Sequence, residues 1–198
     1  MSRQKLRTGD SPINDMVEVC VTPAHPSDSQ LLEGLLQFYL YDFSEQETAE
    51  SDALDFDERG GYGPIVPPAE YWTDPDWHAY LIRLGEKTAG FAFINTRSHR
   101  GGRVQHNMAE FFVARKFRRR GVAKEAVRQI LALLPGSWEV AVKEHNAAAK
   151  AFWPPAVSAA GVTDLTVVEG DGEHWRGPIW TFSVVPRERP SSADVAVT

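Results

Sequence analysis

The chain has 198 residues, of which 42% are hydrophobic and 24% are charged, and its formal net charge at pH 7 is -6. This length and composition predict one globular domain with its own core, and they exclude a fibrous or largely disordered chain. The net negative charge argues against a protein whose main role is to bind nucleic acid, because neutralising phosphates requires an excess of Lys and Arg.

Three features of the sequence bear on where the protein acts. Cys20 is the only cysteine, so an intramolecular disulfide is impossible and a reducing compartment, the cytoplasm, is expected. Residues 1–15 carry basic side chains but no following apolar stretch, so they do not resemble a secretory signal. A membrane span needs roughly 20 consecutive apolar residues, and charged residues interrupt apolar stretches such as residues 81–94 well before that length. Cys20 falls within a predicted strand, where a buried, unreactive thiol is expected.

The first half of the chain predicts a strand, a helix and a long irregular segment. Alternating valines predict a half-buried strand over residues 16–22. Leucines at helical spacing predict a helix over residues 31–41, with Ser27 and Gln30 as its capping box. Residues 42–76 are acidic, aromatic and rich in Gly and Pro, so a short helix and long loops are expected there.

The second half predicts alternating strands and helices. The predicted strands cover residues 80–84, 90–95, 107–113, 138–142, 165–169 and 179–185. One predicted helix runs from Val122 to Leu134, and another follows its cap Asn146 and ends at Trp153, before Pro154 and Pro155. Hairpins followed by strand-helix units predict an α/β (α+β) fold, a mixed sheet with helices on both faces.

A single domain is expected over residues 17–185. The segments 1–15 and 187–198 are expected to be flexible ends, because both are polar and neither shows a periodic apolar pattern.

A basic junction between a predicted strand and a predicted helix carries the most information. Residues 115–120 are almost wholly basic and lead into Gly121, Val122, Ala123 and Lys124. Free N–H groups and the helix dipole favour an anion there, and small residues let a diphosphate approach the backbone. The arginines could instead form a solvated surface, but positive side chains are disfavoured at a helix N-terminus unless an anion lies between them. The spacings of a Walker loop and of a Gly-rich dinucleotide fingerprint are absent.

Two blocks of the sequence resemble the GNAT family of N-acetyltransferases. In its acetyl-CoA-binding signature, Arg or Gln, two variable residues, Gly, one variable residue and Gly or Ala line the pyrophosphate. Arg118, Gly121 and Ala123 match that signature. The block that begins at Asn146 is similar to the Asn-x-x-Ala helix after the fifth strand of the family. Residues 39–45 also look like part of an uncharacterised bacterial subgroup of predicted acetyltransferases.

The resemblance implies a mostly antiparallel sheet of six to seven strands with a splayed central strand pair. The strand before the signature would pair with the pantetheine arm and the thioester of acetyl-CoA. The cofactor contacts implied are Phe111, Phe112, Val113, Arg118, Arg119, Arg120, Gly121, Val122, Ala123, Lys124, Asn146, Phe152 and Trp153. The expected reaction is transfer of an acetyl group to a primary amine of a small molecule or protein, by direct attack on the thioester.

Glu110 is the candidate base that accepts the proton of the attacking amine, although it could also be a surface or salt-bridged glutamate. The weaker candidates are Asp42, Glu45 and His78. Many members of the family have a tyrosine seven residues after the Asn, as the acid toward the leaving thiolate, where this chain has Trp153. Trp cannot donate that proton, so Trp153 is expected to be a packing wall beside the pantetheine. The acid is then one of Tyr39, Tyr41, Tyr62 and Tyr71, or water, or the thiolate leaves unassisted.

The acceptor is expected to be a small-molecule or peptide amine. Clustered carboxylates and aromatic rings over residues 39–77 would attract an ammonium group, although most of these carboxylates could simply face water. The candidate acceptor-binding residues are Tyr41, Asp42, Glu45, Tyr71 and Trp72. The histidines show no metal-ligand spacing, so no metal is predicted. A monomer or homodimer without nucleic-acid or membrane partners is expected.

Two other functions stay open from the sequence. Trp153 in place of tyrosine is compatible with a catalytically silent module that binds or senses acyl-CoA. The cluster Arg118 to Arg120 could serve an anion-binding or nucleic-acid-binding domain, against which the net charge argues.

Overall fold

The computed structural model describes residues 18–63 and 65–186, so the segments 1–15 and 187–198 lie outside the described residues. Within these residues a seven-stranded sheet has the order β1-β2-β3-β4-β5-β7-β6. Its strands are β1 (Val19–Pro23), β2 (His78–Leu84), β3 (Lys87–Arg97), β4 (Arg103–Val113), β5 (Gly136–Ala141), β6 (Thr163–Glu169) and β7 (Pro178–Val184). Only β4 and β5 pair in parallel, which confirms the predicted mixed, mostly antiparallel sheet.

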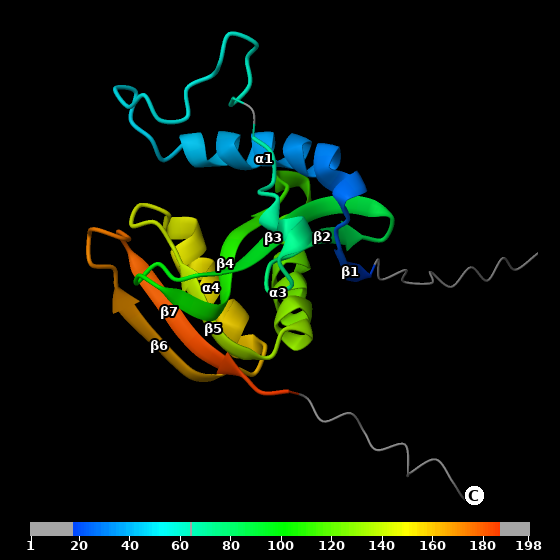
Figure 1. Cartoon of the computed structure of the whole chain (residues 1–198), viewed down its shortest axis with the longest axis vertical. Coiled ribbons are helices and arrows are strands. Elements are labelled where there is room, and N and C mark those ends of the chain that lie inside the picture. The colour runs from blue at the N-terminus through cyan, green and yellow to red at the C-terminus, as the bar shows by residue number, and fades with distance from the viewer. Residues whose placement is uncertain (1–17, 64, 187–198) are drawn as a thin grey trace, which may run out of the picture.

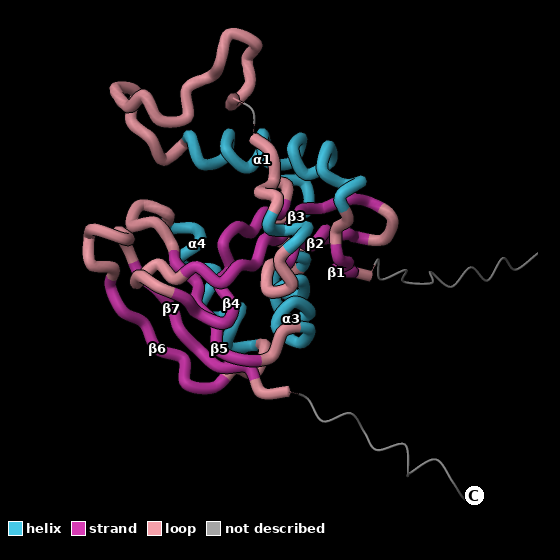
Figure 2. The backbone as a smooth tube through the Cα atoms, in the orientation of Figure 1, coloured by secondary structure: helices cyan, strands magenta, loops and turns pink. Residues whose placement is uncertain are grey.

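Helices lie on both faces of this sheet, as predicted (Figures 1 and 2). The helices are α1 (Ser29–Ser44), α2 (Glu70–Thr73), α3 (Val122–Leu133) and α4 (Ala147–Ala159). Alternation along β3 separates two cores, because Phe91 and Phe93 pack with α1 and α2 while Ala92 and Ile94 pack with α3 and α4. We call these two faces the α1 side and the α3 side. None of the described helices is both long and apolar enough to cross a membrane.

The start of α1 differs from the prediction. Ser27 is not its cap but lies within the short 3-10 helix η1 (Pro26–Asp28) that precedes it. The fixed φ of Pro26 favours this tight turn, and the backbone N–H of His25 donates to the Asp28 carboxylate at 2.9 Å. The helix also runs three residues beyond the predicted end, to Ser44, and it buries Leu32 and Leu36 against the sheet.

The end of α4 was also predicted wrongly. The helix does not stop before Pro154 and Pro155 but continues through both to Ala159. Each proline removes one helical N–H and strains the preceding turn, at a cost of about 3 kcal/mol in an exposed helix. Trp153, Ala156 and Val157 are buried against the α3-side core, and this packing holds the last turns in place.

The single thiol is exposed, contrary to the expectation of a buried one. Strand β1 lies at the edge of the sheet, and its side chains alternate between the two faces. Val21 is buried in the α3-side core, whereas its neighbour Cys20 points away from that core into solvent.

The middle of the sheet opens at β4 and β5. The two strands pair only at His106 with Trp138 and at Asn107 with Glu139, and beyond these positions no pairing joins them. On its other edge β4 carries a bulge, because Glu110 pairs with Phe93 and Met108 with Ile94 while the residue between them has no partner. The end of β4 is thus held by β3 alone, and its other edge is free to bind a ligand.

Candidate active site

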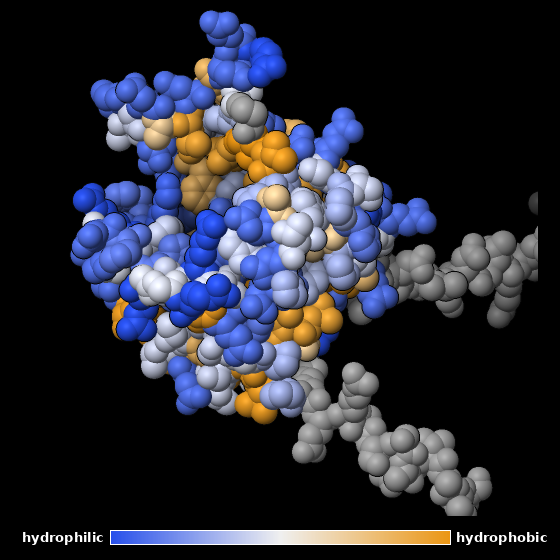
Figure 3. Space-filling model, viewed as in Figure 1, coloured by the Kyte–Doolittle hydropathy of each residue, from blue (hydrophilic) through white to orange (hydrophobic). Residues whose placement is uncertain are grey.

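A cavity of about 1010 Å³ lies where β4 and β5 separate. Its walls come from the end of α1, the end of β4, the basic segment after β4, the start of α3, and α4 with the loop before it. In the face drawn in Figure 3, apolar side chains gather along the underside of α1 beside a hollow. This volume exceeds that of most drug-sized ligand sites, so the cavity can take a large elongated molecule.

The predicted anion junction forms one end of the cavity. Gly121 precedes α3 in a left-handed conformation with φ +80, which glycine adopts without strain, and the space beside its Cα is open. Gly121, Ala123 and Lys124 line the cavity, together with Arg118 and Arg119. Free N–H groups of the first turn of α3 therefore meet small residues and positive charge in one place.

Two residues of the predicted cofactor set do not line the cavity. Val122 is 1% exposed and packs in the α3-side core, where it anchors the first turn of α3. Arg120 is exposed to solvent at the turn before the helix. Its charge lies near the junction without forming the wall.

A carboxylate of α1 already engages the arginines. Asp42 accepts a bond from Arg115 Nε at 2.8 Å, and the Arg118 guanidinium also pairs with it. Arg118 Nε donates as well to the main-chain oxygen of Val113, at 2.6 Å. Asp42 thus ties the end of α1 to the predicted anion junction, and its negative charge offsets part of the positive charge there.

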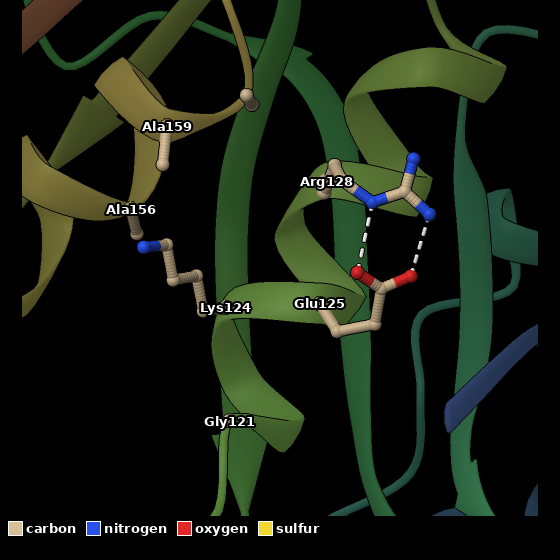
Figure 4. Close-up of a pocket in the computed structure, with 7 residues that line it drawn as sticks. Gly121, Lys124, Glu125, Arg128, Ala156 and Ala159 are labelled. Atoms are coloured by element: carbon tan, nitrogen blue, oxygen red, sulfur yellow. Dashed lines mark hydrogen bonds and ion pairs between the residues drawn. The ribbon is translucent and has the colours of Figure 1, made fainter. Parts of the chain in front are cut away.

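A smaller cavity of about 170 Å³ adjoins the large one between α3 and α4 (Figure 4). Gly121, Lys124 and Ala156 line both cavities. The carboxylate of Glu125 would repel an anion here, but hydrogen bonds from Arg128 at 2.6 and 2.8 Å neutralise it. The bond from Arg128 lowers the pKa of Glu125 to about 2, so the pair stays ionic and adds little net negative charge.

The free end of β4 and the helix α4 form the apolar walls. Phe111 stacks on Phe152 at a centroid distance of 6.0 Å and meets Trp153 edge-on at 5.3 Å. Asn146 caps α4 by accepting a hydrogen bond from the Ala149 N–H at 2.9 Å, which fixes where the helix begins. The remaining predicted β4 contacts, Phe112 and Val113, line the same cavity.

Glu110 lies on the α1 side, joined to Tyr39 by a hydrogen bond that the tyrosine hydroxyl donates. Tyr39 lines the cavity, whereas Glu110 is not among the residues of its wall. Burial raises the pKa of Glu110, and the Tyr39 bond and the nearby charges of His99 and Lys143 only partly offset that effect. Burial and then the Glu110 charge raise the pKa of Tyr39 well above its ordinary value. A carboxylate of raised pKa is a better proton acceptor near neutral pH.

The predicted acceptor-binding residues separate into two groups. Asp42 and Glu45 line the cavity at the end of α1. Tyr71 is buried against Phe93 at a centroid distance of 4.5 Å, and Trp72 packs beside it on the α1-side core. Tyr41 is 56% exposed on the outer surface of α1. These three aromatic residues do not line the cavity.

The structure adds cavity residues that the sequence did not single out for the site, namely Phe43, Gln46, Arg115 and His145. One signal was present, because Phe43 follows Tyr39 by four residues and so shares its helix face. Arg115 also carried a signal, because it belongs to the basic segment 115–120. Gln46 and His145 depend on how the end of α1 meets the loop after β5, which no local pattern shows. Within residues 18–63 and 65–186 no group of three His, Cys, Asp or Glu side chains is gathered that could hold a metal ion.

Comparison with known proteins agrees with this geometry. Residues 36–154 match the model of the acetyltransferase (GNAT) family. The chain therefore belongs to that family, whose members transfer acyl groups from acetyl-CoA. No curated protein sequence matches the chain.

Solved structures share the fold at low sequence identity. An acetyltransferase from Thermus thermophilus superimposes with a TM-score of 0.53 at 18% identity, over 86% of this chain and 99% of that one. A GNAT-family acetyltransferase from Staphylococcus aureus gives a TM-score of 0.55 at 9% identity, over 85% and 100% of the two chains. At such identities the likeness shows the architecture alone.

Proposed function

We propose that this protein is an N-acetyltransferase that transfers the acetyl group of acetyl-CoA to a primary amine of a small molecule or a peptide. The observation that carries the proposal is the cavity at the opening between β4 and β5. The free β4 edge and the anion junction of α3 line this one space, as a thioester joined to a diphosphate requires.

In this proposal the junction binds the pyrophosphate of CoA. Free N–H groups of α3 and the side chains of Arg118, Arg119 and Lys124 would hold it, and Gly121 leaves room for it at the backbone. The unpaired edge of β4 at Phe111 to Val113 would hold the arm, with Phe152 and Trp153 as its apolar wall. When the acceptor amine attacks the thioester carbonyl of acetyl-CoA, a backbone N–H of β4 would stabilise the negative charge that develops on the carbonyl oxygen.

The acceptor would enter from the α1 side, where Glu110 lies. A positioned amine and thioester react faster because the protein supplies their orientation in advance. Glu110 would accept the proton that the attacking nitrogen loses, and its raised pKa suits that role near neutral pH. Asp42 and Glu45 line the cavity as well, but both pair with Arg115 at the junction, so their negative charge is matched there.

Binding of CoA is the first test. Isothermal titration should show saturable binding of CoA. Gly121→Glu should weaken that binding by more than about 100-fold, because the introduced carboxylate would repel the negatively charged pyrophosphate of CoA. Gly102→Glu is a matched control, since Gly102 also has φ +80 and open space but lies in the turn before β4. Equal losses in both variants, or no CoA binding by the natural protein, would refute the proposal.

Turnover is the second test. Release of free thiol from acetyl-CoA should be screened with polyamines, amino acids, aminoglycosides and peptides. Transfer to at least one amine is expected. Thermal stabilisation by CoA without transfer to any amine would favour the silent acyl-CoA-binding module instead, a function with which the buried Trp153 is compatible.

A further inference from the structure

The leaving thiolate needs an acid, and Trp153 cannot be that acid because its indole N–H does not ionise usefully. All five tyrosines of the chain lie in the described residues. Tyr41 is exposed on the outside of α1, Tyr62 packs on Phe56 at 5.0 Å in the loop after α1, and Tyr71 and Tyr80 are buried in the two cores. Among them only Tyr39 belongs to the cavity wall.

Aromatic packing holds Tyr39 in place. Its ring lies 4.7 Å from Phe43, 5.8 Å from Phe91 and 6.1 Å from Phe112, measured between centroids. Its hydroxyl donates to the Glu110 carboxylate. Phe112 is itself part of the free β4 edge that lines the cavity. The tyrosine is therefore the group through which the buried carboxylate of Glu110 is connected to the cavity.

We propose that Tyr39 is the acid that protonates the leaving thiolate, with Glu110 as the partner that stores and returns its proton. This inference rests on the acetyl transfer proposed above. It moves the acid from α4 to α1, on the opposite side of the sheet from Trp153.

The proton balance closes with these two residues. The neutral amine attacks the thioester carbonyl, the C–N bond forms, and the nitrogen becomes positively charged. That nitrogen gives its proton to the Tyr39 oxygen while Tyr39 passes its own proton to Glu110. The C–S bond then breaks with its electron pair on sulfur. Tyr39 protonates the sulfur and recovers a proton from Glu110, so amide and thiol form with no net change in the pair.

The electrostatics of the pair fit this exchange. Burial and then the charge of the ionised Glu110 raise the pKa of Tyr39. Once Glu110 holds a proton, the part of this rise that its charge causes is gone, and the phenol becomes a stronger acid at the moment of C–S cleavage. The other charged or titratable groups acting on Glu110 and Tyr39 are Tyr71 of α2, His99 of the loop after β3, and Lys143 of the loop after β5.

Kinetics of Tyr39→Phe provide the first test, with Tyr80→Phe as the control because Tyr80 is buried on the α3 side. With acetyl-CoA and the best amine of the panel, Tyr39→Phe should lower kcat by roughly 100-fold or more. The Kd for CoA should change less than about twofold. With acetyl-seleno-CoA, whose selenolate leaves without protonation, the loss should shrink to less than about tenfold. Equal losses with both donors would mean that Tyr39 does not protonate the leaving group and would overturn its role as acid.

A second test needs no acceptor. 3-Fluorotyrosine placed at position 39 should titrate, by fluorine NMR, at higher pH than the free amino acid. The Glu110→Gln change should lower that titration point because it removes the neighbouring charge. An unchanged titration point would refute the pairing.

The failures are distinguishable. If the natural protein transfers acetyl groups and Tyr39→Phe does so at full rate, this inference falls while the acetyltransferase function stands. If the natural protein binds no CoA, the proposed function falls and this inference falls with it.

Discussion

The two sides of the sheet are assembled in different ways. On the α3 side, one continuous segment from Phe111 to Lys124 supplies the strand edge, the arginines and the helix start of the cavity. On the α1 side, Tyr39 comes from α1, Glu110 from β4 and Lys143 from the loop after β5. A site within one segment can be predicted from the sequence, whereas a site made of residues from distant segments can be recognised only once the fold is known.

This difference matches the chemistry assigned to each side. Binding a diphosphate needs small residues, positive charge and a helix start, all of which short-range spacing provides. Proton transfer needs a buried carboxylate against a phenol, and burial is a property of packing. Changes on the α3 side should therefore alter cofactor affinity, and changes on the α1 side should alter turnover.

The largest effect is expected from Glu110→Gln. Turnover should fall by roughly 100-fold or more, because the amide cannot accept the proton of the nitrogen. The Kd for CoA should stay within about twofold, since Glu110 does not line the cavity. Steady-state kinetics and calorimetry check the two quantities. A change confined to CoA affinity would break the division between the sides.

The same variant should be more stable at neutral pH. Burial raises the pKa of Glu110, so the folded state binds its proton more tightly than the unfolded state does. This contribution to stability is complete below the ordinary pKa of glutamate and is lost as the pH rises through the folded value. At neutral pH Glu110→Gln should raise Tm by a few degrees, a gain that vanishes on acidification. Glu86→Gln, at an exposed turn, is the control.

The next largest effect is on the free energy of unfolding, and it tests the pairing of β3 with β4 in the middle of the sheet. A Cβ at Gly90 would lie 1.9 Å from the main-chain oxygen of Phe112. Gly90→Ala should therefore cost roughly 1–3 kcal/mol by forcing β3 and β4 apart. Gly34→Ala in α1 meets open space and should stabilise the helix by about 0.5–1 kcal/mol. Urea unfolding measures both, and a neutral Gly90→Ala would show that the two strands can move apart freely.

Much of the fold could be predicted from the spacing of apolar residues and the positions of Gly and Pro, including a mixed, mostly antiparallel sheet with helices on both faces. The errors came from long-range packing. Pro154 and Pro155 predicted a helix end, yet buried residues on either side of them continue α4. Cys20 was expected to be buried, but the edge position of β1 leaves it exposed. A local pattern shows neither the position of a strand in the sheet nor the packing across it.

The residues of the candidate site differ in the same way, because some could be predicted from local spacing and others depend on long-range packing. The Arg118, Gly121 and Ala123 spacing placed the junction, and all three residues line the cavity. Tyr39 was one of several tyrosines that the sequence could not separate, because its approach to Glu110 spans 71 positions of the chain. Tyr71 and Trp72 were predicted to bind the acceptor because residues 39–77 are acidic and aromatic, but the structure places both in the α1-side core.

A smaller effect, on CoA affinity, is expected from Asp42→Asn, because Asp42 connects α1 to the arginines of the junction. Asp42 pairs with Arg115 and Arg118, so its charge competes with a phosphate for both. Removing that charge should tighten CoA binding by up to about fivefold, given the roughly 0.2–1 kcal/mol typical of exposed ion pairs. The gain should shrink at high salt. Calorimetry at two salt concentrations measures it, with Glu33→Gln of α1 as the control. Weaker CoA binding would mean that Asp42 positions the arginines instead of competing for them.

The smallest effect should come from the edge of the sheet, remote from both sides of the site. Cys20 is exposed on β1, with three strands between it and β5. Iodoacetamide should therefore alkylate it in the folded protein, and mass spectrometry should show one label. CoA affinity should not change by more than about twofold, because Cys20 does not line the cavity. Protection until the chain is unfolded would mean that another surface covers the β1 edge, and a loss of affinity would show that this edge is coupled to the opening between β4 and β5.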